Sequence, residues 1–184
     1  MDHKIFFPQE LAGAVVDAFS GVFHAPDSVS HDEMLFGVDG VLSTIYIKGD
    51  IVGKVSIFLR AQGAAAIVGA MLCVEDLAPE APETLDGMGE LLNMIAGRLK
   101  TRLDPHKVSF DISEPSTRMT SIVAPGRWEN NLEQSFSVKG IHFRVLLSYR
   151  VASKEDKIEP VPAPQKIKLT AAELLKQVLA KKKT

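Results

Sequence analysis

The stretch DGMGELLNMIAG, residues 86–97, decides the fold that we predict for this chain. It lies within a long helix that opens at Pro82 or Thr84 and ends near Asp104-Pro105. At about 3.6 residues per turn, the spacing i, i+4, i+7, i+11 keeps four residues within one narrow arc: Asp86, Glu90, Asn93 and Gly97. Three apolar residues fall on the opposite side, where they can anchor the helix in a core: Leu92, Ile95 and Leu99.

Length and composition bound the remaining possibilities. The 184 residues are enough for one substantial core, and a net charge of -2 gives no general attraction to nucleic acid or membrane surfaces. Cys73 is the only cysteine, so no intrachain disulfide can form. It ends an apolar helix, so we interpret it as a small buried hydrophobic residue. The start of the chain lacks the pattern of a secretory signal, and the apolar run 64–74 is too short to span a bilayer. We expect a cytoplasmic protein.

Hydrophobic periodicity predicts the order helix, three strands, two helices, three strands. The first helix follows Pro8, and the expected strands cover 32–38, 41–48 and 51–60. The alternation in 51–60 predicts one buried face and one partly wet face. A helix over 62–73 precedes the long helix, a strand over 106–113 is stopped by Pro115, and 132–138 pairs with 141–149 through Lys139-Gly140.

The composition changes after Val151. We therefore divide the chain into a domain over 1–152 and a tail over 153–184 that holds a proline-rich linker and an amphipathic helix at 169–183. Thr170 and Glu173 form a capping box for that helix. A helix this short is marginal alone in water, so we expect it to dock on its own domain or a dimer mate, on a separate partner, or on an anionic surface.

The sequence lacks the motifs of several common enzyme classes. There is no phosphate-binding P-loop, no dinucleotide-binding glycine motif and no nucleophile elbow. The five histidines are scattered without metal-ligand spacing, so no metal or cofactor is expected in this chain itself.

The polar stripe on the long helix has two interpretations. Acids and amides are common on solvated helix faces, which favours a purely structural stripe. However, asparagine is a poor helix former, and each of Gly87, Gly89 and Gly97 weakens the helix by roughly 1 kcal/mol relative to alanine. These costs suggest the close approach of another backbone.

The segment 89–97 resembles the signature helix of the CheX/CheC/FliY family of chemotaxis phosphatases. That family is marked by Ser or Asp, three residues, Glu, two residues, Asn and a distant Pro, which here correspond to Asp86, Glu90, Asn93 and Pro115. The hairpin within 39–59 is also similar, and the resemblance covers about residues 5–150. The motif occurs once, as in CheX, whereas CheC commonly carries two copies. The resemblance implies an α+β fold, with long helices packed on a mainly antiparallel sheet of about six strands, and a homodimer formed through sheet edges.

The resemblance also implies a function: a hydrolase that dephosphorylates the phosphoaspartate of a CheY-type response regulator in chemotaxis-type signalling. Asn93 orients the attacking water, Glu90 pairs with the regulator's lysine, and Asp86, Gly97 and Pro115 have supporting roles. The regulator's own site supplies Mg²⁺. The alternatives are a non-catalytic regulator-binding or flagellar-switch scaffold, and a structural protein whose stripe is merely solvated.

Overall fold

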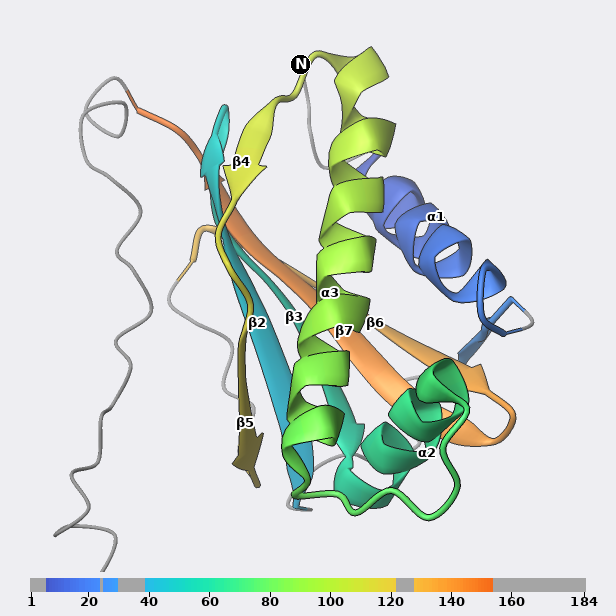
Figure 1. The fold of residues 1–184 in the computed structure, drawn as a ribbon. Helices are drawn as coiled ribbons and strands as arrows, with labels where there is room; N and C mark the ends of the chain where they lie inside the picture. Colours follow the sequence, from blue (N-terminus) through green and yellow to red (C-terminus); the bar gives the residue numbers. More distant parts are fainter. Residues whose placement is uncertain (1–5, 24, 30–38, 122–127, 154–184) are drawn as a thin grey trace, which may run out of the picture.

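The computed structural model describes residues 6–23, 25–29, 39–121 and 128–153 (Figure 1). The predicted strand over 32–38 and the predicted helix over 169–183 lie outside the described residues, and the proposed division at 152/153 stays a prediction.

Within the described residues, three helices accompany one antiparallel sheet. In chain order the elements are α1 (Phe7–Ser20), β1 (Asp27–Val29), β2 (Gly40–Gly49), β3 (Ile51–Arg60), α2 (Ala61–Leu72), α3 (Pro82–Leu103), a 3₁₀ turn (Asp104–His106), β4 (Phe110–Ile112), β5 (Ser116–Thr120), β6 (Asn130–Val138) and β7 (Ile141–Val151). The strand order is β1-β6-β7-β3-β2-β4, and β5 also pairs with β2. The predicted α+β class is confirmed, with seven strands in place of about six.

Two of the described strands were not predicted: β1, and β5 at the edge beside β2. We predicted that Pro115 ends the strand 106–113, but the chain resumes pairing with β2 directly after it as β5. Between the two pieces, the Ser113 amide still donates to the Tyr46 carbonyl at 2.9 Å. Proline lacks an amide hydrogen and is tolerated at sheet edges. Here it therefore interrupts an edge strand without ending it.

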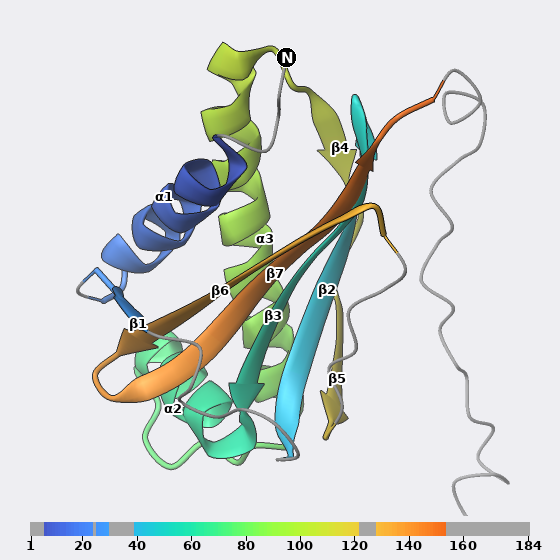
Figure 2. The same ribbon diagram turned by 180° about the vertical axis from the view of Figure 1, so that it is seen from behind.

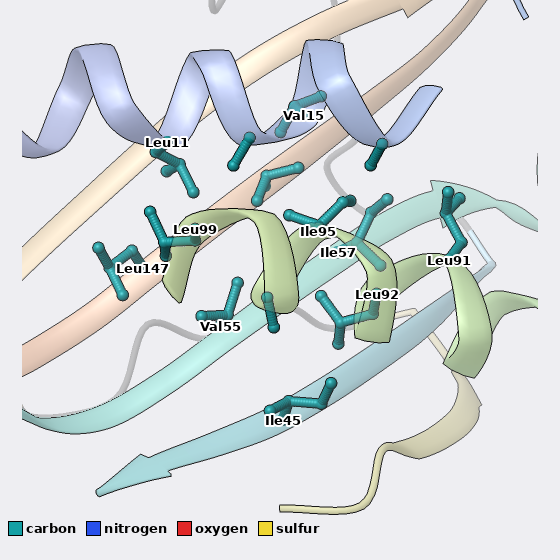
Figure 3. Close-up of a cluster of buried hydrophobic side chains, with 14 of the residues drawn as sticks. Leu11, Val15, Ile45, Val55, Ile57, Leu91, Leu92, Ile95, Leu99 and Leu147 are labelled. Atoms are coloured by element: carbon teal, nitrogen blue, oxygen red, sulfur yellow. The ribbon is translucent and has the colours of Figure 1, made fainter. Parts of the chain in front are cut away.

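All three helices lie on one face of the sheet, as the two opposite views show (Figures 1 and 2). The core fills the space between α1, α3 and this face (Figure 3). The predicted anchors Leu92, Ile95 and Leu99 are fully buried there. The described helices include none that is long and apolar enough to cross a membrane.

Both predicted hairpins are present. β2 and β3 pair through the turn at Gly49-Asp50, and β6 and β7 pair through Lys139-Gly140, whose φ angles of 50° and 77° suit a tight primed turn. The sequence pattern left open whether the last strand is central, and the structure places β7 between β6 and β3.

The sheet face opposite the helices is drier than predicted. We expected Ser56 and Phe58 of β3 to be partly wet, but both are buried. Nearby, Arg144 lies over the Phe58 ring at 6.0 Å and donates to Glu133 at 2.6 Å. An ion pair lets the buried guanidinium keep its charge at a tolerable cost in free energy.

A polar cluster fixes α3 against α1. Arg102 Nε donates to Asp17 at 2.8 Å, its Nη1 donates to Glu10 at 3.3 Å, and His106 lies 3.1 Å from the same glutamate. The hydrogen bond to Asp17 is the main reason why the pKa of Arg102 is raised. Gly13 leaves the space for this side chain, since a Cβ there would lie 2.4 Å from the guanidinium carbon. The cluster holds α3 at a defined angle.

Candidate functional site

The polar stripe predicted on the long helix is present on α3. Asp86 and Glu90 are exposed, whereas Asn93 and Gly97 are half-buried. Three consecutive helical turns therefore present an acid, an acid and a carboxamide to the outside. The Asn93 side chain is not sealed beneath its neighbours, so a docking molecule can reach it.

An open groove of about 410 Å³ runs beside the N-terminal half of this stripe. Its lining comes from the loop before α3, from α3 itself and from the start of β5: Glu80, Pro82, Leu85, Asp86, Gly89, Glu90, Pro115 and Thr117. The structure thus brings Pro115 beside Asp86 and Glu90, from which it is far removed in the sequence. Asn93 and Gly97 do not line the groove and lie further along the same helix.

Pro115 lies against α3 because Gly89 has no side chain. A Cβ on Gly89 would lie 3.3 Å from Pro115 Cγ and 3.3 Å from Thr117 Oγ1, tighter than most real contacts. The Thr117 hydroxyl also lies 2.9 Å from that of Ser43 on β2, which ties β5 to the sheet. This packing gives Pro115 a physical role, which is to hold the edge strand against the helix that carries the stripe.

The other side of α3 is fixed by α2 and by the connecting loop. Thr84 is buried, and its hydroxyl donates to the Ala78 carbonyl at 2.7 Å. Pro82 occupies the first helical turn, where a missing amide hydrogen costs nothing. Gly87 admits the Val68 side chain of α2, since a Cβ there would lie 2.4 Å from Val68 Cγ1.

Two of the three helical glycines differ from our prediction. We expected the close approach of another backbone, but side chains approach Gly87 and Gly89. At Gly97 a Cβ would meet nothing within 4 Å. The first two glycines therefore serve packing within the domain, while the third leaves open space on the outer face of α3.

The polar groups of the stripe are not used within the described domain. Among the residues that the structure describes, the side chains of Asp86, Glu90 and Asn93 have no hydrogen-bond or ion-pair partner. In the same part of the chain, no group of three or more His, Cys, Asp and Glu residues is arranged to hold a metal ion. The stripe thus offers acceptors and an amide to another molecule.

Sequence reasoning missed Leu85 and Thr117 as part of the groove. Leu85 follows the general apolar pattern of α3, and Thr117 falls in the strand that we expected to have ended. No local signal marks either residue, because the groove forms only when β5 packs against α3.

The model of the family described as "Chemotaxis phosphatase CheX" matches residues 41–124, which contain the stripe, the groove and Pro115. No curated protein matches the chain by sequence. Among solved structures, CheX from Vibrio vulnificus has a TM-score of 0.69 at 17% identity, covering 82% of this chain and 100% of that one.

Two further solved structures share the fold. The CheX–CheY–BeF3–Mg²⁺ complex from Borrelia burgdorferi has a TM-score of 0.61 at 18% identity and covers 77% of this chain and 96% of that one. Thermotoga maritima FliY has a TM-score of 0.55 at 17% identity and covers 75% and 84%. The resemblance seen in the signature helix is thus confirmed by the family model, and the α+β architecture by the structures.

Proposed function

We propose that this CheX-like chain is a phosphatase that hydrolyses the phosphoaspartate of a CheY-type response regulator. The observation that carries the proposal is the pair Glu90 and Asn93: a carboxylate and a carboxamide one turn apart on a fixed helix, both accessible and both without a partner among the described residues. The family match over 41–124 supports it, as does the solved Borrelia burgdorferi CheX complex that contains CheY, BeF3 and Mg²⁺.

In the proposed reaction, Asn93 positions a water molecule in line with the bond that breaks. Its amide oxygen accepts a hydrogen bond from the water, while the amide NH₂ group donates to a phosphoryl oxygen or to the regulator. The water oxygen attacks phosphorus and the bond from phosphorus to the aspartyl oxygen breaks. The electron pair stays on the restored carboxylate. Inorganic phosphate leaves as H₂PO₄⁻ with both protons of the water, one of which it can release to solvent. Positioning of this kind is the main contribution that proteins make to phosphoryl transfer.

Glu90 sets the register of docking in this scheme. Its exposed carboxylate pairs with the lysine of the regulator's site, and such a charge-assisted contact is stronger and more directional than a neutral hydrogen bond. Asp86 and Pro115 shape the adjacent groove, which accepts a neighbouring part of the regulator. Gly97 keeps the surface beyond Asn93 low enough for close approach.

The metal belongs to the regulator in this proposal. A Mg²⁺ ion bound there neutralises charge on the phosphoryl oxygens. The residues of this chain contribute an amide and a carboxylate, which fits a shared site in which the partner supplies the cation. A homodimer, implied by the family resemblance, remains part of the proposal, and the outer strands β1, β4 and β5 are the candidate edges.

The test is an assay of acyl-phosphate loss from purified receiver proteins of the same genome, with and without this protein. We expect acceleration by the native chain and none by Asn93→Ala, although the variant keeps its fold. Asn131→Ala, at an exposed position on β6, is the matched control and keeps full activity. Unchanged phosphate release by stable Asn93→Ala would contradict the catalytic role.

The same experiment separates the phosphatase from a non-catalytic regulator-binding scaffold. The scaffold interpretation predicts that the native chain binds a BeF3-activated receiver tightly without accelerating dephosphorylation. A purely structural stripe predicts neither binding nor acceleration. The accessible, unpartnered carboxamide favours catalysis over both alternatives, since a binding surface alone does not require an amide at a helix-weakening position.

A further inference from the structure

A second open groove, of about 420 Å³, lies on α2, away from the polar stripe. Its floor and walls come from α2 and from the loop that follows it: Gln62, Ala65, Ala66, Gly69, Val74, Glu75, Asp76 and Leu77. We propose that this groove binds the chain's own C-terminal segment, residues 169–183. The inference does not depend on the phosphatase activity.

Alanine, valine and leucine side chains line part of the groove, and the exposed Leu72 lies two residues before Val74 at its rim. Leu72 is 49% exposed and Val74 is 47% exposed, which places both among the most exposed large apolar residues described. Ala66 keeps the helix surface low, and small residues allow another helix to approach closely. The space over Gly69 is taken by the chain's own Val74 carbonyl, which would lie 2.7 Å from a Cβ there. An exposed apolar surface of this kind marks an interaction site.

The shape of the groove is fixed by the end of α2. Cys73 adopts the left-handed conformation at φ 55°, and the Val74 amide donates back to the Gly69 carbonyl at 2.9 Å. This arrangement ends the helix and turns Val74 outward. The apolar rim is therefore a property of the local fold. We had interpreted Cys73 as a buried hydrophobic residue, but it is exposed beside the rim.

Charge selects the occupant. Two exposed acids, Glu75 and Asp76, line the groove, and neither has an ion-pair partner in the described part of the chain. The segment 169–183 carries four lysines and one glutamate. Its predicted apolar side consists of Leu174, Leu175, Val178 and Leu179. A basic amphipathic helix is thus complementary to a groove that carries two acids and adjoins exposed apolar side chains.

The intervening chain is long enough to connect the two. The 15 residues 154–168 span about 46 Å at the ~3.1 Å per residue of extended proline-rich chain. The described chain ends just after β7, whose 11 residues cover about 36 Å. The first residue of β7, Ile141, lies against Gly63 at the start of α2. One strand length therefore separates the start of the linker from the groove, and the linker can bridge it.

The only cysteine of the chain provides the test, because it is exposed at the rim. A nitroxide attached to Cys73 of the ¹⁵N-labelled full chain broadens amide NMR signals of nearby segments. We expect strong broadening over 169–183 and none over 154–160. Lys181→Glu with Lys182→Glu should remove most of the broadening. The matched control, Lys154→Glu with Lys157→Glu, changes the same charge in the linker and should leave the broadening intact.

Charge exchange makes the experiment specific. Glu75→Lys with Asp76→Lys should also abolish the broadening, and combining these two changes with the charge-reversed tail should restore it. Sharp amide signals over 169–183 in the native chain would overturn the proposal. A mixture of spin-labelled unenriched protein with ¹⁵N-enriched Cys73→Ser protein tests whether the bound tail belongs to the same chain. Broadening in this mixture as strong as within one chain would mean that the tail of a second copy occupies the groove. That result would also overturn the proposal.

Discussion

Replacement of Gly97 by alanine tests the function of the stripe in a way that separates it from stability. A Cβ at this position meets no atom within 4 Å, so the substitution introduces no steric conflict inside the domain. Alanine is more favourable than glycine within a helix by about 0.8–1 kcal/mol. We therefore expect Gly97→Ala to raise the free energy of unfolding by about 1 kcal/mol, and the melting temperature by about 2–4 °C for a chain of this size.

The same methyl group stands one turn beyond Asn93 on the surface that we assign to the regulator. If the regulator packs closely there, the overpacked contact costs about 1 kcal/mol or more. A cost of that size corresponds to about fivefold weaker binding. The expected combination is a more stable protein with a lower rate of dephosphorylation at limiting receiver concentration.

The measurements are urea unfolding, for stability, and titration with a BeF3-activated receiver, for affinity. Gly87→Ala is the matched control on the same helix, because its new Cβ would lie 2.4 Å from Val68 Cγ1. That variant should lose stability. A Gly97→Ala protein that gains stability and keeps full affinity would refute the proposed docking surface, and one that loses stability would refute the assignment of open space.

Three further predictions follow from other parts of the structure. Glu90→Gln should raise the receiver concentration needed for half-maximal rate by about tenfold, because it removes one charge-assisted contact. Glu114→Gln, at another exposed glutamate, should leave that concentration unchanged. Equal effects of the two substitutions in receiver titrations would argue against a docking role for Glu90. Burial, and secondly the charge of Arg118, lower the pKa of Lys54. The Lys54 amine therefore stays protonated to higher pH in the unfolded chain than in the folded one. At neutral pH the charged Lys54 destabilises the fold, and this destabilisation is relieved as the pH rises toward 10.5. Lys54→Met should be more stable at pH 7, with the difference from the native chain shrinking in urea unfolding at alkaline pH; a constant difference would contradict this origin. Thr84→Val removes the hydroxyl that donates to the Ala78 carbonyl and should lower the free energy of unfolding by about 1 kcal/mol. Hydrogen exchange should show faster opening of residues 74–82. Unchanged exchange there would mean that other contacts hold the loop.

Local patterns in the sequence were sufficient for the elements that depend on neighbouring residues. The hairpin at Lys139-Gly140 followed from residues that accept positive φ, and the long helix followed from its apolar repeat and from Pro82. The stripe of Asp86, Glu90 and Asn93 followed from helical geometry alone. These predictions succeeded because turn chemistry and side-chain periodicity act over a few residues.

Other features depended on contacts between distant parts of the chain. The sequence suggested a partly wet face for Phe58 and a buried Cys73, but Phe58 is buried and Cys73 is exposed. β5 was missed because its pairing with β2 continues beyond a proline that ends strands in most local contexts. In each case the outcome depends on contacts with residues that are distant in the sequence, which a local hydrophobic pattern does not record.

The sequence by itself determined which residues share one face of α3, because 3.6 residues per turn fixes that face whatever packs around it. Only the tertiary structure decided that Pro115 meets Gly89, that the Asn93 carboxamide stays accessible, and that Gly97 faces open space while Gly87 does not. These outcomes depend on where α2 and β5 pack against the helix, and burial of apolar surface across the whole domain fixes those positions.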